Sequence, residues 1–397
     1  MRDQRLTLSL LPVVLTVALL LLAGVLFSGC YTIRQGTAYL GYLSRARPLE
    51  SLLAPTGDPE EDERNRLFVE RVQDIRYFAQ HELGLNVGRS YSRYVAVDRD
   101  FLVAVVSASA KDSFTTHLWR YPIVGALPYR GYFNIDGAHR QRERLEARGL
   151  DVWIRGVDAF STLGFFADPV FTFMRNYRVD RLADLIIHES LHATVWLRGQ
   201  GHFNEELAQL VGVEGARLYI VSRYGEDSDE YRAMVAARAD SRAFREFIWE
   251  LIAELEVLYG SGAEREVILR EREIIKAAAQ ERFAAEYDER FLSDNFRGFS
   301  TMPINNAYLD LFRIYTPADG FVENLFERSG MTLAEFIAAA ISMPRRGPPG
   351  RERLARTLGL WYEMMGIDEP AHSASAGGNM ASEREQREFA REEREWR

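Results

Sequence analysis

Two histidines and a glutamate lie within five residues of one another and could bind a metal ion for hydrolysis. His188, Glu189 and His192 form the arrangement HExxH in the segment LIIHESLHATVW, residues 185–196. On an α-helix, residues four apart return to nearly the same face, so both imidazoles can reach one ion. Glu189 can then activate a water molecule beside that ion. The pattern predicts a catalytic site with Zn²⁺ as cofactor.

The same residues could instead be structural, as two buried core histidines with a surface glutamate between them. Leu191, Val195 and Trp196 continue an apolar face and predict an amphipathic or buried helix. Polar side chains in such a helix are costly unless they are hydrogen-bonded or bound to a metal. The surroundings therefore favour the metal site.

A third ligand is expected from the segment HFNEELAQLVG, residues 202–212. Glu205 opens an apolar helix, from which its carboxylate could project back toward the first helix. His202 is a rival, since a third imidazole would also leave one open position on the metal. Glu206 is a second rival, but it lies about a hundred degrees further round the helix and would point elsewhere.

The pattern typical of metzincins is absent, because the residue six positions after His192 is Arg198 and not a histidine. We therefore predict His188, His192 and Glu205 as metal ligands. Glu189 is predicted as the general base, which takes a proton from the attacking water and delivers one to the leaving amine.

Two neighbouring residues have open roles. Tyr219 could stabilise the developing oxyanion or could simply pack in the core. Asn204 could orient a ligand, but asparagine is also preferred as a helix N-cap, and the cap is the favoured interpretation.

Other polar residues are weaker candidates. The segment 161–169 could line a substrate cleft or form a packed loop. Asp158 or Asp168 could bind the free amine of a substrate, although neither stands in a motif. Residues 305–307 (Asn-Asn-Ala) could border the site, with a helix cap as the favoured alternative.

Several sequence blocks outside the zinc helix match one family in order. They are Gly29-Cys30-Tyr31, Arg34-Gln35-Gly36, YPIVGALPYRGYF (121–133), VWIRGVDAFSTLGFFADPV (152–170) and Asn305-Asn306-Ala307, together with LIIHESLHATVW and FNEELAQLVG. From residue 29 to about residue 345 the chain resembles the bacterial predicted-aminopeptidase lipoproteins, a family of gluzincin-like zinc peptidases. The resemblance implies a membrane-anchored enzyme that acts at peptide N-termini. FNEELA is also similar to the NExxA element of gluzincins, which implies Glu205 as the zinc ligand.

The N-terminus has the features of a bacterial lipoprotein signal peptide, predicted here as residues 1–29. Two arginines precede an apolar run, which ends in LFSGC at residues 26–30. Cleavage would leave Cys30 at the mature N-terminus, where acyl chains would anchor it to a membrane. The alternative is an uncleaved transmembrane anchor, because the run is long enough to span a bilayer and Phe27 is unusual in a lipobox. Either way we expect the protein at the cell envelope, on the extracytoplasmic side.

Composition excludes some classes of protein. The chain has 397 residues, of which 47% are hydrophobic, so it can bury a substantial core. A formal net charge of −9 and the lack of a basic stripe argue against nucleic-acid binding. Cys30 is the only cysteine, so stability must come from packing and the metal.

The expected partners are a peptide substrate and a membrane, and no oligomeric state is indicated.

The elements that must position the site are mostly helical. Helix-forming patterns predict a helix at 67–84, a helical hairpin from 227 to about 291, and two or more helices within 305–343. Residues 140–148 are predicted to form a polar helix. Strands are predicted at 94–97 and 101–106, paired as a hairpin, and at 152–154. We predict an α+β fold: a mainly helical, zincin-like metallopeptidase domain over residues 30–370, with a small β-sheet bordering the zinc helix. Residues 371–397 are predicted to be a disordered, charged tail.

Three functions fit these observations. The first is a zinc aminopeptidase of the cell envelope, and the second is a zinc endopeptidase or other amide hydrolase with the same metal site. The third is a lipid-anchored scaffold with structural zinc. No fourth cysteine or histidine near the motif closes the shell, which favours an open catalytic position.

Overall fold

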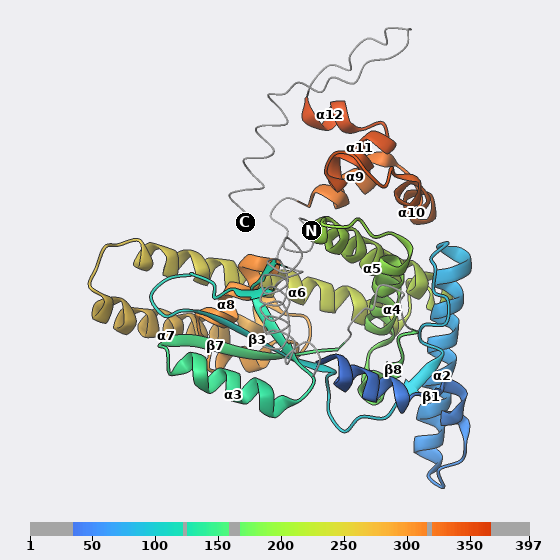
Figure 1. Ribbon diagram of the computed structural model, residues 1–397, viewed down its shortest axis with the longest axis horizontal. Helices are drawn as coiled ribbons and strands as arrows, with labels where there is room; N and C mark the ends of the chain where they lie inside the picture. The colour runs from blue at the N-terminus through green and yellow to red at the C-terminus, as the bar shows by residue number, and fades with distance from the viewer. Residues whose placement is uncertain (1–34, 122–124, 159–166, 316–319, 367–397) are drawn as a thin grey trace, which may run out of the picture.

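The computed structural model describes residues 35–121, 125–158, 167–315 and 320–366. These residues form a mainly helical molecule with small β-sheets (Figure 1), so the α+β prediction is confirmed. The signal peptide with Cys30, the C-terminal tail and most of the segment 161–169 lie outside the described residues.

The largest sheet is antiparallel and lies between helices. Its strand order is β6 (Tyr129–Tyr132), β3 (Val103–Ala110), β7 (Leu150–Val157). Helix α3 (Ile135–Glu146) packs on the face that carries alternate β3 side chains, among them Val106, and α8 (Asn306–Tyr315) also contacts β3 and β7. Seven of the eight β3 residues are buried, including Ser107 and Ser109, so both faces of this strand are covered.

The predicted hairpin between residues 94–97 and 101–106 is wrong. Strand β2 (Arg93–Val95) instead pairs with β1 (Arg47–Pro48) and, in parallel, with β8 (Val170–Phe171), whereas β3 joins the other sheet. Arg99, between the two runs, donates to the carbonyls of Leu102 and Phe133. These bonds tie the connecting segment to the second sheet, so it does not form a tight turn.

The helices form two groups. The main core joins α2 (Pro59–Tyr77) to α4 (Val179–Thr194) and α5 (Gly201–Tyr224), with the C-terminal helices packed beside α5. Helices α6 (Asp229–Tyr259) and α7 (Arg265–Arg290) form the predicted hairpin, which is confirmed and extends to one side of the molecule (Figure 1). The remaining bounds are α9 (Phe321–Ser329), α10 (Leu333–Ser342), α11 (Gly350–Thr357), α12 (Trp361–Met365), β4 (Trp119–Tyr121) and β5 (Gly125–Leu127).

Helix α2 begins eight residues earlier than predicted. Asp58 caps it by accepting a hydrogen bond from the Glu60 amide, and Pro59 occupies its first position. An N-cap aspartate followed by proline and acidic residues is a strong helix start. The proline- and acid-rich residues 55–63 therefore include the first turn of this helix.

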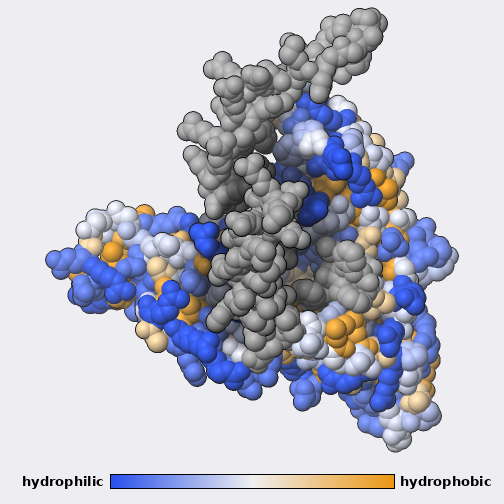
Figure 2. Space-filling view, viewed as in Figure 1, coloured by the Kyte–Doolittle hydropathy of each residue, from blue (hydrophilic) through white to orange (hydrophobic). Residues whose placement is uncertain are grey.

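None of the described helices is both long and apolar enough to cross a membrane. Figure 2 shows hydrophilic residues over much of one face, with hydrophobic residues scattered between them.

Candidate metal centre

Helices α4 and α5 are consecutive and bring the candidate ligands together. Asn204 closes the connection between them: its side chain accepts from the Leu197 amide and donates to the Leu197 carbonyl, both at 2.9 Å. The predicted N-cap role of Asn204 is wrong, because the cap position is Gln200 and Asn204 is buried one turn inside α5. The residue holds the turn that directs α5 back across α4.

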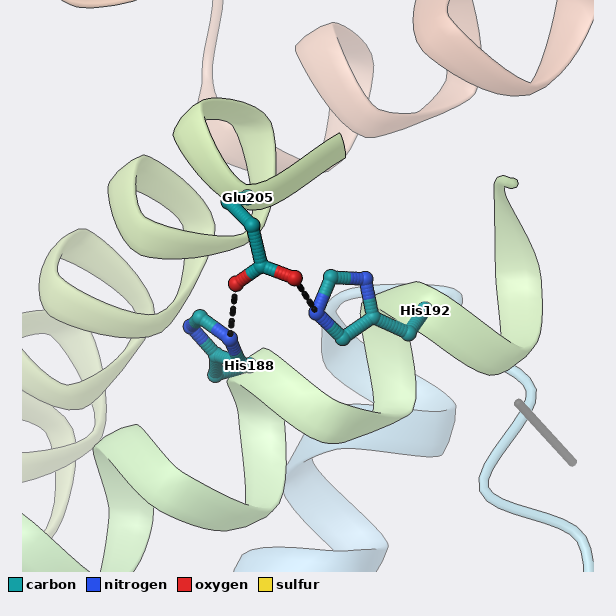
Figure 3. Close-up of side chains that lie close together, drawn as sticks. All are labelled: His188, His192 and Glu205. Atoms are coloured by element: carbon teal, nitrogen blue, oxygen red, sulfur yellow. Dashed lines mark ion pairs between the residues drawn. The ribbon is translucent and has the colours of Figure 1, made fainter. Parts of the chain in front are cut away.

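The two imidazoles of α4 point at the carboxylate of Glu205 on α5 (Figure 3). The distance from Glu205 Oε2 to His188 Nε2 is 3.6 Å, and from Oε1 to His192 Nε2 it is 3.4 Å. Ligand atoms about 2.1 Å from a tetrahedral ion lie about 3.4 Å from one another. The three side chains can therefore share one ion, and their ligand atoms all lie within 4.8 Å of each other.

Glycines let the two helices approach closely. A Cβ atom at Gly212 would lie 2.3 Å from Asp184 Oδ1 and 3.0 Å from His188 Cβ. A Cβ atom at Gly215, one turn further along α5, would lie 3.0 Å from Ile187 Cγ2. Because Gly212 has no side chain, α5 can lie against the His188 face of α4 and hold Glu205 over both histidines.

The C-terminal helices hold the first turn of α5 from its other side. The Gly350 amide at the start of α11 donates to Gln200 Oε1 at 3.2 Å. A Cβ at Gly350 would lie 2.4 Å from the Phe203 ring, so the backbone of α11 packs directly on that ring. The beginning of α5 is therefore fixed between α4 and α11.

The charges in the cluster shift the pKa values of His188 and Glu205. Burial alone would lower the pKa of His188, but contact with Glu205 and the charges of Glu189, Glu205 and Asp184 together raise it. Partial removal from water would raise the pKa of Glu205, but the two imidazoles outweigh this effect and lower it to about 2. Glu205 is therefore ionised throughout the physiological range, as a ligand carboxylate must be.

His192 is the more deeply placed of the two histidines. It is 4% exposed, and the Trp196 ring packs against it with the ring centroids 5.4 Å apart. Its Nδ1 atom has no hydrogen-bond partner in the described part of the chain, while Nε2 faces Glu205. Two imidazole nitrogens and one carboxylate oxygen form a donor set that suits zinc and related divalent ions.

Glu189 follows His188 on α4, and its charge helps to raise the pKa of that histidine. It lines a narrow pocket of about 10 Å³ together with Tyr91, Asp168 and Ser190. Tyr91 has a left-handed backbone with a φ of 61°, unusual for a residue with a side chain, and its amide donates to the Asp168 carbonyl at 2.6 Å. The catalytic candidate therefore faces a buried polar pocket beside the metal cluster.

Comparison with known proteins identifies the family. A family model described as "Putative aminopeptidase" matches residues 30–354, most of the chain. The chain belongs to this family. No match was found among curated proteins or among solved structures. The aminopeptidase family that the sequence blocks indicated is thus confirmed, and membership of it supports a peptidase-like role.

The rival ligands in this aminopeptidase-family chain point elsewhere. His202 is exposed and is not part of the cluster. Glu206 is buried and accepts from the Val322 amide at 3.1 Å and from Arg351 Nε at 2.9 Å, so it contacts the C-terminal helices. Glu205 and Glu206 are adjacent on α5 but contact different helices, because neighbouring residues lie about a hundred degrees apart around a helix.

The remaining candidates have structural contacts. Tyr219 is buried and donates to Asp74 Oδ2 at 2.9 Å, so it packs in the core. Asp158 forms an ion pair with Arg181. Asn305 accepts from the Tyr308 amide at 3.0 Å, which is the predicted helix cap for α8.

Asp168 is the exception, since it lies in the same pocket as Glu189 and accepts from the Tyr39 hydroxyl at 2.7 Å. Gly212 and Tyr91 were not among the residues predicted from the sequence. A glycine inside an apolar helix was an available signal for Gly212, because glycine there costs stability unless close packing needs it. No local pattern distinguishes Tyr91, whose backbone conformation depends on distant contacts.

Proposed function

We propose that this protein is a zinc-dependent aminopeptidase that hydrolyses the N-terminal peptide bond of peptides with a free amino end. The observation that carries the proposal is the convergence of His188, His192 and Glu205 at distances suited to one ion. Membership of the aminopeptidase family supports the reaction class. Placement of the third ligand on the helix that follows HExxH supports a gluzincin-like, zincin-type site.

A catalytic centre fits the donor set better than a structural one. Structural zinc sites have four protein ligands, whereas catalytic sites have three and leave one position for water or substrate. Within the described ranges the cluster consists of three residues, His188, His192 and Glu205. This count favours an open position and disfavours the scaffold hypothesis.

The mechanism assigns each side chain a role. Zinc held by these three residues would act as a Lewis acid that polarises the scissile carbonyl and lowers the pKa of water. Glu189 accepts the proton of the water that attacks the carbonyl carbon. It then gives a proton to the leaving nitrogen as the C–N bond breaks, so the carboxylate is regenerated in each cycle.

The substitution Glu189→Gln tests this assignment. We expect the variant to keep its zinc and to lose a factor of about 10² to 10⁴ in kcat, because general acid–base catalysis contributes about that much. Zinc content by atomic emission and hydrolysis of peptides by the full chain are the measurements. A variant that remains fully active would overturn the mechanism.

A peptide panel separates exopeptidase from endopeptidase action. We expect release of the first residue from unblocked peptides and no release from the same peptides after N-acetylation. Equal cleavage of both sets would favour the endopeptidase alternative.

We also propose that Cys30 carries lipid and anchors the protein to the outside of a bacterial membrane. The lipobox-like sequence supports this, as does the start of the family match at residue 30. Mass spectrometry of the mature N-terminus provides the test. An acylated Cys30 without residues 1–29 would support the proposal, and an intact N-terminus would indicate a transmembrane anchor instead.

A further inference from the structure

A cavity of about 370 Å³ lies beside the segment 86–93 and is also lined by Leu43, by Ala167 and by Ala193 near the end of α4. Its walls are formed largely by small side chains, among them Ser90, Ala167 and Ala193. Because these residues fill little space, the cavity could admit a side chain or the end of a short peptide.

The loop that forms the cavity wall is held firmly. Arg76 of α2 donates from Nε to the Ser90 carbonyl at 2.8 Å and from Nη2 to the Gly88 carbonyl at 3.1 Å. The Asn86 amide donates to Thr194 Oγ1 at 2.8 Å, which ties the loop to the end of α4. A wall fixed at both ends can hold a ligand without first being ordered, which lowers the cost of binding.

The cavity adjoins the pocket of the catalytic candidate. Asn86, Val87, Ser90 and Ala193 line both the cavity and the narrow pocket that contains Glu189. Ala193 lies one helical turn after Glu189, a rise of about 6 Å along the α4 axis. An extended peptide covers about 3.3 Å per residue, so the cavity is within about two residues of a bond placed at Glu189.

The charge of the cavity is positive. Arg89 and Arg93 both line it, and none of its described lining residues is acidic. Arg93 also donates to the Ala46 carbonyl, which fixes its position. The chain as a whole has a net charge of −9, so two arginines in one cavity are a local reversal of its charge. Guanidinium groups match carboxylates in both charge and geometry.

We infer that this cavity is a subsite for a carboxylate of the peptide substrate, one or two residues from the bond that is cleaved. The inference rests on the proposed peptidase function and adds to it a substrate class. The carboxylate comes either from an acidic side chain or from the C-terminus of a short peptide.

Paired substrates distinguish the two sources. Ala-Glu-Ala-amide against Ala-Gln-Ala-amide tests an acidic side chain, and trialanine against trialanine amide tests a free C-terminus. For at least one pair we expect the full chain to show about a tenfold higher kcat/KM for the peptide that carries the carboxylate. A hydrogen bond to a charged group contributes enough free energy for about a tenfold difference.

The double substitution Arg89→Met, Arg93→Met should reduce this kcat/KM ratio to about one. The matched control is Arg270→Met, which removes an exposed arginine of α7 and should keep the ratio of the wild type. Circular dichroism and zinc content show whether each variant is folded and loaded. A ratio near one in the wild type, or a preference that survives the double substitution, would overturn the inference and leave the proposed function intact.

Equilibrium binding tests the subsite separately from catalysis. Calorimetry with the same peptide pairs should show tighter binding of the carboxylate member to the wild type than to the double variant. If no peptide is hydrolysed, the proposed function fails, but this binding difference would still support the subsite. Equal binding of both members would overturn it.

Discussion

Two helix pairs in this molecule arrange their charged side chains in different ways. In the α6–α7 hairpin, the buried cations are directly paired: Arg272 lies 2.7 Å from Asp151, and Lys276 lies 2.8 Å from Glu273. In the α4–α5 pair, Glu205 stands 3.4 and 3.6 Å from the two histidine nitrogens. The distances at Arg272 and Lys276 are those of charge-assisted hydrogen bonds. The distances from Glu205 to the two histidine nitrogens are too long for good hydrogen bonds.

The difference indicates what each pair is built for. Direct contact neutralises a buried charge within the protein, so Arg272 and Lys276 of the hairpin are paired without a ligand. The wider spacing at α4–α5 leaves room for an ion between three ligand atoms, while Gly212 lets the two helices lie close enough for Glu205 to reach both histidines. Substitutions in the α4–α5 pair should therefore affect metal binding, whereas substitutions in the hairpin should affect stability alone.

Removing a ligand should have the largest effect. His192→Ala leaves two ligands, so we expect zinc affinity to fall by more than about a hundredfold, beyond the loss typical of outer-shell changes, and hydrolysis to be lost. Chelator competition measures the affinity. The matched control is His202→Ala, which removes an exposed histidine outside the cluster and should retain zinc. Loss of zinc in that control instead would show that the ligand set is wrong.

Breaking the buried pair of the hairpin should affect stability and not metal binding. Arg272→Met leaves Asp151 buried without its cation, and we expect the free energy of unfolding to fall by about 3 kcal/mol. Denaturant unfolding of the zinc-loaded protein measures this change. A folded Arg272→Met variant that has lost its zinc would contradict the separation of the two regions.

Widening the α4–α5 gap should weaken the metal site without removing a ligand. Gly212→Ala places a methyl group against Asp184 and His188, and we expect zinc affinity to fall about 10- to 100-fold, as for outer-shell changes. Gly215→Ala is the control, because its methyl group meets only Ile187 and Leu83 side chains. Equal losses in both variants would mean that helix packing in general, and not the placement of Glu205, sets the affinity.

Protons should compete with the metal at α4–α5. His188 must be neutral to bind zinc, and its pKa is raised above the ordinary value of 6.5 despite burial, because of Glu205 and the nearby acids. Protonation of His188 should not affect zinc affinity above that raised pKa, and below it the one proton that His188 must lose should lower the affinity by about tenfold for each pH unit. Chelator competition over a pH series checks this, and affinity that is constant with pH would contradict it.

The sequence predicted what depends on local periodicity. The HExxH helix and the α6–α7 hairpin were visible because apolar residues recur at helical spacing. The pairing of β2 with β8 was not, because strand partners are chosen by contacts far apart in the chain. The capping preference of asparagine suggested the wrong role for Asn204, since its side chain bonds a loop that only the tertiary structure brings near. Asp168 could be placed beside Glu189 only once the fold was known.

The anchoring of α5 by α11 has a consequence for how the protein is made. The first turn of α5 is held by Gly350 and Arg351, through Gln200, Phe203 and Glu206. A ribosome adds these two residues about 145 residues after Glu206 has been synthesised. The turn that carries Glu205 therefore receives this support only after α11 has been synthesised. A nascent or truncated chain without residues 350–351 lacks that support, so assembly of the candidate metal centre is coupled to synthesis of α11.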